Sequence, residues 1–153
     1  MIRRRHFIRL ASALLLLALA GCAPRRIEVP LYRYDNDTVV RLSAEAHARD
    51  IGGLALWVQP TGSMRPTIQD YDWVVVALPD KAPYAGVQEG QVLLYNAEWT
   101  APGTPRVLHR AAQKDRDGWI MSGDNNAHYE SKWRVNAANY LGRAVAIYRT
   151  RAL

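Results

Sequence analysis

The segment VQPTGSMRPTIQDYDWVVVA, residues Val58–Ala77, joins a corner rich in Gly, Ser and Pro to a strongly apolar run. Gly, Ser and Pro each favour chain reversal for a different steric reason. The run Trp73–Leu78 is rich in the β-branched residues typical of strands. The segment therefore predicts a turn that leads into a buried β-strand. A surface turn and a position for a nucleophilic Ser63 both fit this pattern, because a serine is a weak nucleophile until a base accepts its proton.

Short apolar runs separated by turn residues continue on both sides of this segment, a pattern typical of an all-β domain. The sequence contains no long amphipathic helix that could cover a parallel sheet. We therefore expect a mainly β fold, an antiparallel coiled sheet or barrel with one short N-terminal helix. The helix is expected to follow Ser43 and to end at Gly52. The expected strands are Ile27–Tyr34 at an edge, Leu54–Gln59, Trp73–Leu78, Gln91–Tyr95, Arg106–Gln113, Trp119–Ser122 and Tyr140–Arg149.

The first 22 residues have the layout of an export signal. Arg3–Arg5 and Arg9 form a basic start, Leu10–Ala20 is apolar, and small residues lead to Cys22. The apolar run is shorter than the roughly 20 residues that a membrane-spanning helix needs. Leu19–Cys22 resembles a lipobox, the motif at which bacterial lipoproteins are cut before a cysteine that receives diacylglycerol.

Cys22 is the only cysteine of the chain, so no internal disulfide can form. We expect residues 1–21 to be a lipoprotein signal peptide, 22–42 a lipid-anchored tether and 43–153 the folded domain. The protein would then lie in the cell envelope, anchored to a membrane by lipid and facing the periplasm or the exterior, with the outer membrane favoured where the cell has one. An ordinary signal cut near Ala20, which would leave a free thiol, is the alternative.

The charge distribution argues against a nucleic-acid partner. The 153 residues carry a net charge of +6, but four of the 20 Lys and Arg residues lie in the signal and none of the 14 acidic residues does. The remaining chain has 16 basic and 14 acidic groups, a net charge of +2. A domain so close to neutral has little general attraction for polyanions.

Three further residues could join Ser63 in catalysis. His109 lies in the apolar run RVLHRAAQ, whose alternation places it on the inner face, and a histidine can act as a general base near neutral pH. The stretch SGDNNAHYES supplies two carboxylates, Asp124 and Glu130. A carboxylate beside a catalytic imidazole fixes its tautomer. A satisfied core histidine and a polar hairpin would produce the same patterns.

Together these segments resemble the type I signal peptidases, which share a serine-protease superfamily with the LexA-like self-cleaving repressors. In that family the nucleophile lies in a Ser-Met-x-Pro-Thr box, present here as Ser63–Thr67, and a later Gly-Asp-Asn-Asn box is present here as Gly123–Asn126. The resemblance covers about Gly52–Tyr148 and implies the antiparallel β fold of the signal peptidase type. The segment that contains His109 lies between these two boxes, so the three segments occur in the family's order.

The residue that acts as base separates the branches of this family. Most bacterial members use a lysine, whereas the archaeal and endoplasmic-reticulum branch uses a histidine in a His-Arg-Val box, which His109-Arg110-Ala111 resembles. The resemblance implies Ser63 as nucleophile, His109 as base, and an acid six residues after the Asp of the later box. That acid is Glu130 here, where the family usually has Asp, with Asp124 as the other candidate or a brace for the turn. Thr61 and the Ser63 backbone N–H match the oxyanion donors.

The resemblance thus implies a lipid-anchored serine endopeptidase that hydrolyses exported polypeptides, with no metal or organic cofactor. A catalytically silent lipoprotein that uses the same β fold for binding or assembly is the main alternative, and a domain that cuts only its own chain is a third. The oligomeric state does not follow from the sequence.

The lipobox predicts that Cys22→Ser blocks lipidation and leaves a precursor that still carries its signal, because no thiol is left to receive the lipid. Metabolic labelling with palmitate and electrophoretic mobility measure this. Wild-type protein that takes up no label would refute the lipid anchor.

Overall fold

The computed structural model of the protein describes residues 25–97 and 106–151. The predicted signal peptide and Cys22 lie outside the described residues. The elements are β1 (Leu31–Tyr34), α2 (Asp37–Asp50), β2 (Leu54–Trp57), β3 (Trp73–Ala77), the 3-10 turn η1 (Tyr84–Gly86), β4 (Val92–Asn96), β5 (Arg106–Asp115), β6 (Gly118–Ser122), β7 (Glu130–Val135) and β8 (Tyr140–Thr150).

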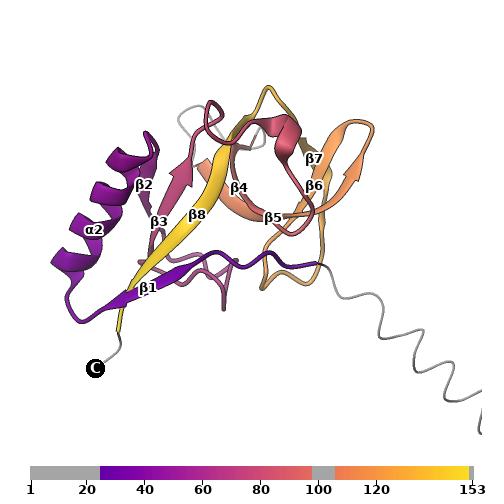
Figure 1. Ribbon diagram of the computed structural model, residues 1–153. Coiled ribbons are helices and arrows are strands. Elements are labelled where there is room, and N and C mark those ends of the chain that lie inside the picture. Colours follow the sequence, from indigo (N-terminus) through magenta and orange to yellow (C-terminus); the bar gives the residue numbers. More distant parts are fainter. Residues whose placement is uncertain (1–24, 98–105, 152–153) are drawn as a thin grey trace, which may run out of the picture.

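All eight described strands belong to one sheet in the order β2-β3-β8-β4-β5-β6-β7, with β1 paired to β8. The β1–β8 ladder is parallel and the others are antiparallel. The sheet curls around itself at the β4–β7 end, while α2 lies at the opposite end (Figure 1). The prediction of a mainly β, antiparallel coiled sheet with one helix is confirmed.

Strand β8 is the longest element of the sheet and joins its two halves. Its first residues pair with β4, its last residues pair with β1, and β3 runs along its other edge. Gly142 of β8 has φ +149°, and a Cβ there would lie 2.4 Å from the Ala77 carbonyl oxygen. A glycine is therefore required where β8 passes between the end of β3 and β4.

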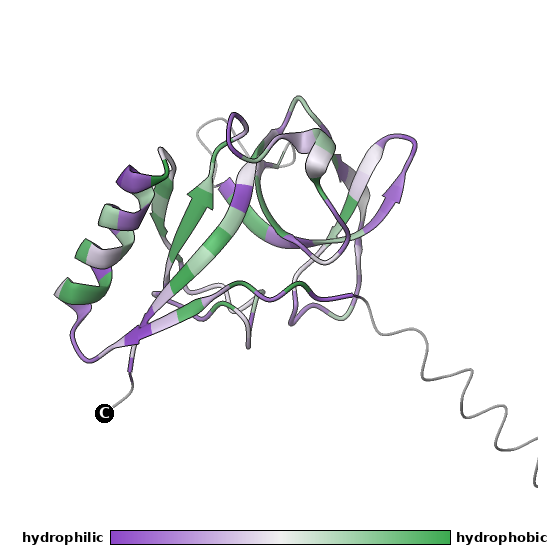
Figure 2. Cartoon of the chain, in the orientation of Figure 1, coloured by the Kyte–Doolittle hydropathy of each residue, from purple (hydrophilic) through white to green (hydrophobic). Residues whose placement is uncertain are grey.

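The core covers both faces of the sheet. Helix α2 packs Val40, Ala44 and Ala48 against Val75 and Ala146. A second cluster on the sheet receives two residues from the loop between β2 and β3, Met64 and Ile68, which are 4% and 2% exposed. Strand β3 and the middle of β8 are hydrophobic, and the loops are largely hydrophilic (Figure 2). The loop that carries Ser63 is thus held to the sheet by its own apolar side chains.

Two sequence predictions need correction. The helix begins at Asp37 rather than after Ser43, because the Asn36 side chain accepts hydrogen bonds from the N–H groups of Thr38 and Val39, at 2.8 and 3.2 Å, and caps the first turn. Residues 22–42, predicted as a tether, therefore include β1 and the first turns of α2. Strand β7 was not predicted, because its sequence ESKWRV lacks the apolar alternation on which the strand predictions depended.

A buried ion pair fastens the far end of the Ser63 loop to β8. Arg149 donates from Nε to Asp72 Oδ1 at 2.8 Å and from Nη2 to Oδ2 at 2.7 Å. Arg149 Nη2 also donates to the Thr67 carbonyl at 3.1 Å, and the Gln69 N–H donates to Asp72 at 2.8 Å. Both charged side chains are nearly fully buried. Neither charge has water to replace its partner, so each depends on the other.

We predict that Asp72→Ala lowers the free energy of unfolding by about 3–5 kcal/mol, because it leaves the Arg149 charge buried without a partner. Urea unfolding followed by circular dichroism measures this. The matched control is Asp80→Ala, which removes an exposed carboxylate paired loosely with Lys81 at 3.6 Å and should change stability little. Equal effects of the two substitutions would contradict the assignment.

Candidate active site

Ser63 lies in the loop between β2 and β3, at the centre of several contacts that fix its backbone. Gly62, with φ +69°, makes the turn before it and donates its N–H to Asp70 Oδ1 at 3.1 Å. The buried Met64 follows it. Because the residues on both sides are anchored, the half-buried Ser63 side chain has a defined position.

The Gly123–Asn126 turn packs directly on the backbone of Ser63. The Asn125 N–H donates to the Ser63 carbonyl at 2.9 Å, and Asn125 Nδ2 donates to the Gly62 carbonyl at 3.2 Å. A Cβ at Gly123 would lie 2.6 Å from the Ser63 carbonyl oxygen. The second sequence box therefore supports the first through close backbone contact, which only glycine permits at this point.

His109 of β5 reaches Ser63 from the curled half of the sheet. Its Nε2 lies 3.1 Å from Ser63 Oγ, and the residue is 7% exposed. The ladder between β5 and β6 starts at the Arg110–Ser122 pair, so His109 lies just beyond the end of that ladder. Where that ladder ends, β6 is followed by the Gly123–Asn126 turn, which contacts the serine loop.

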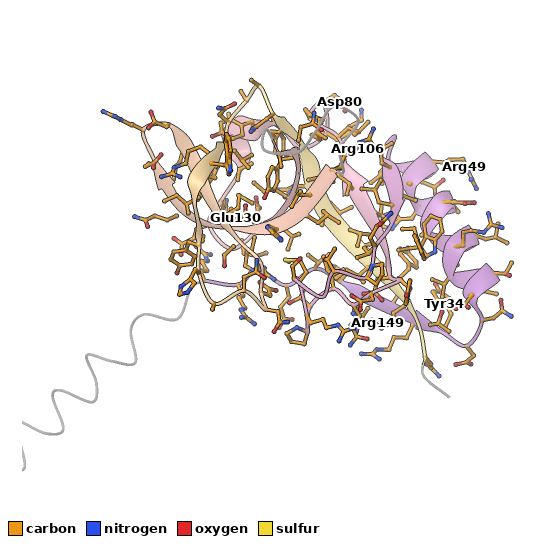
Figure 3. The ribbon with its side chains drawn as sticks, turned by 180° about the vertical axis from the view of Figure 1, so that it is seen from behind. Tyr34, Arg49, Asp80, Arg106, Glu130 and Arg149 are labelled. Atoms are coloured by element: carbon orange, nitrogen blue, oxygen red, sulfur yellow. The ribbon has the colours of Figure 1, made fainter. Side chains whose placement is uncertain are left out.

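Glu130, the first residue of β7, contacts the other ring nitrogen of His109. One carboxylate oxygen, Oε1, pairs with His109 Nδ1, and the other, Oε2, accepts a hydrogen bond from the Tyr95 hydroxyl at 2.7 Å. Glu130 lies on the curled half of the sheet, at the other end of the molecule from Arg49 of α2 (Figure 3). The structure thus brings Ser63, His109 and Glu130 into one continuous chain of polar contacts.

The environment of Glu130 favours its charged form. Burial alone would raise the pKa of this carboxyl, but the hydrogen bond and charge of His109, together with the hydrogen bond from Tyr95, outweigh burial and lower it. Glu130 is therefore ionised at neutral pH and acts only as an acceptor towards its two partners.

Asp124, the other candidate acid, lies in a separate ion pair. Arg110 donates to both of its oxygens at 2.7 Å, and the Thr67 hydroxyl donates to it as well. Burial would raise the pKa of Asp124, but these contacts and the charge of Arg110 lower it. Because His109 and Arg110 are adjacent on a strand, their side chains point to opposite faces and meet different carboxylates.

Thr61 lies near the nucleophile, with Oγ1 3.3 Å from Ser63 Oγ. Within residues 25–97 and 106–151, the Ser63 N–H donates to no acceptor. Thr61 is exposed to solvent, and in the same ranges its hydroxyl contacts only Ser63 Oγ. Both donors are therefore available to an oxygen atom bound next to Ser63. This is the chemistry that acyl transfer through a tetrahedral oxyanion requires.

Sequence reasoning missed two residues of the site, Tyr95 and Arg110. Tyr95 was recognised only as the end of a strand, and Arg110 only as the residue after the histidine. Tyr95 could have been found from the sequence, because its hydroxyl is a polar group at the end of the otherwise apolar run Val92–Leu94. In the described part of the chain, no group of three or more His, Cys, Asp or Glu side chains is arranged to hold a metal ion.

Comparisons with protein-family models, with characterised proteins and with solved structures found no match to this chain. No helix in the described ranges is both long and apolar enough to cross a bilayer.

We predict that Glu130→Gln lowers the free energy of unfolding at neutral pH but not at acid pH. Because the folded pKa of Glu130 is lowered, its contribution is complete above the ordinary titration range of glutamate, near pH 4.3, and is lost as the pH falls through the folded pKa. Urea unfolding at several pH values between 7 and 3 should show wild type and Glu130→Gln converging as the pH falls. The matched control is Glu89→Gln at an exposed glutamate, whose difference from wild type should stay constant. A constant difference for Glu130→Gln would contradict the prediction.

Proposed function

We propose that the protein is a lipid-anchored serine endopeptidase resembling type I signal peptidases of the serine-histidine branch. The observation that carries the proposal is the Ser63 Oγ to His109 Nε2 distance of 3.1 Å, with the Glu130 carboxylate on the other ring nitrogen. A nucleophile within reach of a base, itself oriented by an acid, is the arrangement by which serine hydrolases work.

In this mechanism Ser63 Oγ attacks the scissile carbonyl carbon while His109 Nε2 takes the hydroxyl proton. The imidazolium that forms is stabilised by Glu130, and His109 then gives the proton to the leaving amine. Water repeats the same steps on the acyl-enzyme. The Ser63 N–H and the Thr61 hydroxyl would donate to the oxyanion, and a well-aimed donor of this kind contributes roughly 3 to 4 kcal/mol. Asp124 has a supporting role, since its ion pair with Arg110 holds the turn that contacts Ser63.

The substrate in this proposal is an extended polypeptide that adds a strand beside β2. Strand β2 leads into the serine loop and ends the sheet order, and among the described residues its ladder is with β3. Its other edge offers backbone donors and acceptors to an incoming chain, the usual way in which proteases and peptide-binding domains hold extended peptides. An exported polypeptide that arrives unfolded would suit such an edge.

The lipid anchor would keep this site close to a membrane. Ile27 is already attached to the domain, since its N–H donates to the Gly90 carbonyl and its carbonyl accepts from Arg110 Nη1, both at 3.0 Å. Only five peptide units separate Cys22 from Ile27, and they span at most about 18 Å. We propose a cell-envelope location for this reason, with substrates that pass near the membrane surface.

The proposal predicts that Ser63→Ala and His109→Ala each lower the cleavage rate of an extended peptide with small residues before the cut by at least about 10⁴-fold. The double variant should be no slower than either single variant, because the two residues act as a unit. A fluorophosphonate probe should label the wild-type protein readily. It should label Ser63→Thr and Ser63→Cys weakly or not at all, and Ser63→Ala never.

Matched controls are Ser43→Ala and His47→Gln on α2, which remove the same side-chain types at the other end of the molecule and should leave cleavage unchanged. Folded wild-type protein that neither labels with the probe nor cleaves any peptide of a broad library, its own tether included, would favour a binding or assembly module instead.

A further inference from the structure

Tyr95 is a buried polar residue that contacts two members of the proposed site. It is 1% exposed, its hydroxyl donates to Glu130 Oε2 at 2.7 Å, and the same oxygen lies 3.4 Å from His109 Nδ1. Leu93 is the partner of His109 in the β4–β5 ladder, so Tyr95 is the diagonal neighbour of His109 on the same face. The sheet register therefore holds the Tyr95 hydroxyl beside the ring.

The protons around Glu130 can be assigned from these contacts. An ionised carboxylate has no proton to give, so the proton between Glu130 Oε1 and the ring must belong to His109 Nδ1. The single proton of the Tyr95 hydroxyl points to Oε2. In the neutral ring, His109 Nε2 then carries no proton and can accept one from Ser63. In this arrangement the tyrosine oxygen offers only lone pairs to the ring.

From this we propose that Tyr95 is a positioning residue that holds the Glu130 carboxylate against His109 Nδ1, where Glu130 keeps the ring proton on that nitrogen. The inference rests on the proposed function for its kinetic consequence. It also explains how a glutamate can serve where an aspartate would be shorter by one methylene group. The extra rotatable bond needs a second contact to fix the carboxylate, and the Tyr95 hydroxyl supplies it.

The same geometry implies that the Tyr95 hydroxyl lowers activity when Glu130 is absent. Without the carboxylate, the hydroxyl proton has a remaining acceptor 3.4 Å away, His109 Nδ1. Donation to Nδ1 stabilises the tautomer with the proton on Nε2, which cannot accept the proton of Ser63. Removing the Tyr95 hydroxyl should therefore lower kcat when Glu130 is present and raise kcat when residue 130 is alanine.

The test measures the His109 tautomer and the kinetics in four forms of the mature lipoprotein in detergent micelles. These are wild type, Tyr95→Phe, Glu130→Ala and the double variant. Nitrogen NMR of protein with labelled histidine reports each ring nitrogen above the pH range in which histidine ordinarily titrates. His47, whose Nδ1 lies 2.9 Å from the Tyr148 hydroxyl, is an internal reference that should not change.

We expect the proton on Nδ1 in wild type and Tyr95→Phe, on Nε2 in Glu130→Ala, and a mixture in the double variant. In the kinetics, Tyr95→Phe should lower kcat about tenfold with little change in KM, since a hydrogen bond to a charged group is lost. Glu130→Ala should lower kcat about 10⁴-fold, and adding Tyr95→Phe should raise it again about tenfold.

The matched control is Tyr140→Phe. Tyr140 is the partner of Tyr95 in the β4–β8 ladder, lies in the same core cluster, and donates to the Ala82 carbonyl at 2.7 Å. Its loss should alter stability but neither the tautomer nor kcat. A general packing effect would make the two tyrosine variants alike and would overturn the inference.

The outcomes for the inference and for the proposed function are separable. A proton on Nδ1 in Glu130→Ala, or one on Nε2 in wild type, overturns the role of Tyr95 even if the protein cleaves peptides. The expected tautomers in all four forms, together with a wild-type protein that cleaves nothing, would support the contacts assigned to Tyr95 and refute the peptidase.

Discussion

The alternation of side chains along β5 is the constraint on which the site depends. His109 and Arg110 are neighbours in the chain, yet one contacts Ser63 and Glu130 while the other forms an ion pair with Asp124. The first set of contacts is suited to proton transfer, and the second holds a turn in place. A shift of one residue in the register of β5 would exchange the two side chains and destroy both sets.

The serine loop is fixed from three directions. Met64 and Ile68 bury their side chains in the sheet, the Arg149–Asp72 pair holds its far end, and the Gly123 turn contacts the Ser63 backbone. Loops are ordinarily the mobile part of a domain. Here the loop is packed like an element of the core, which is what a nucleophile needs, because a reacting atom must be held within a fraction of an ångström.

The two carboxylates illustrate how environment divides similar residues between roles. Asp124 is enclosed by Arg110 and the Thr67 hydroxyl, so its charge is neutralised by a permanent cation. Glu130 faces a histidine and a tyrosine, neither of which carries a permanent charge. Only the second carboxylate can stabilise a charge that appears on its neighbour during a reaction. This difference supports Glu130, rather than Asp124, as the acid in the proposed mechanism.

Local patterns in the sequence determined the β class, seven of the eight described strands and the residues from which a site could be built, because alternation and turn chemistry act over a few neighbouring residues. They did not reveal β7, whose polar sequence becomes a strand only through pairing with β6, or the early start of α2, where a single Asn36 cap decides the boundary. Sequence also left Glu130 and Asp124 as rivals. Only the tertiary structure separated them, because it set the register of β4, β5 and β6 that places Tyr95, His109 and the two carboxylates relative to one another.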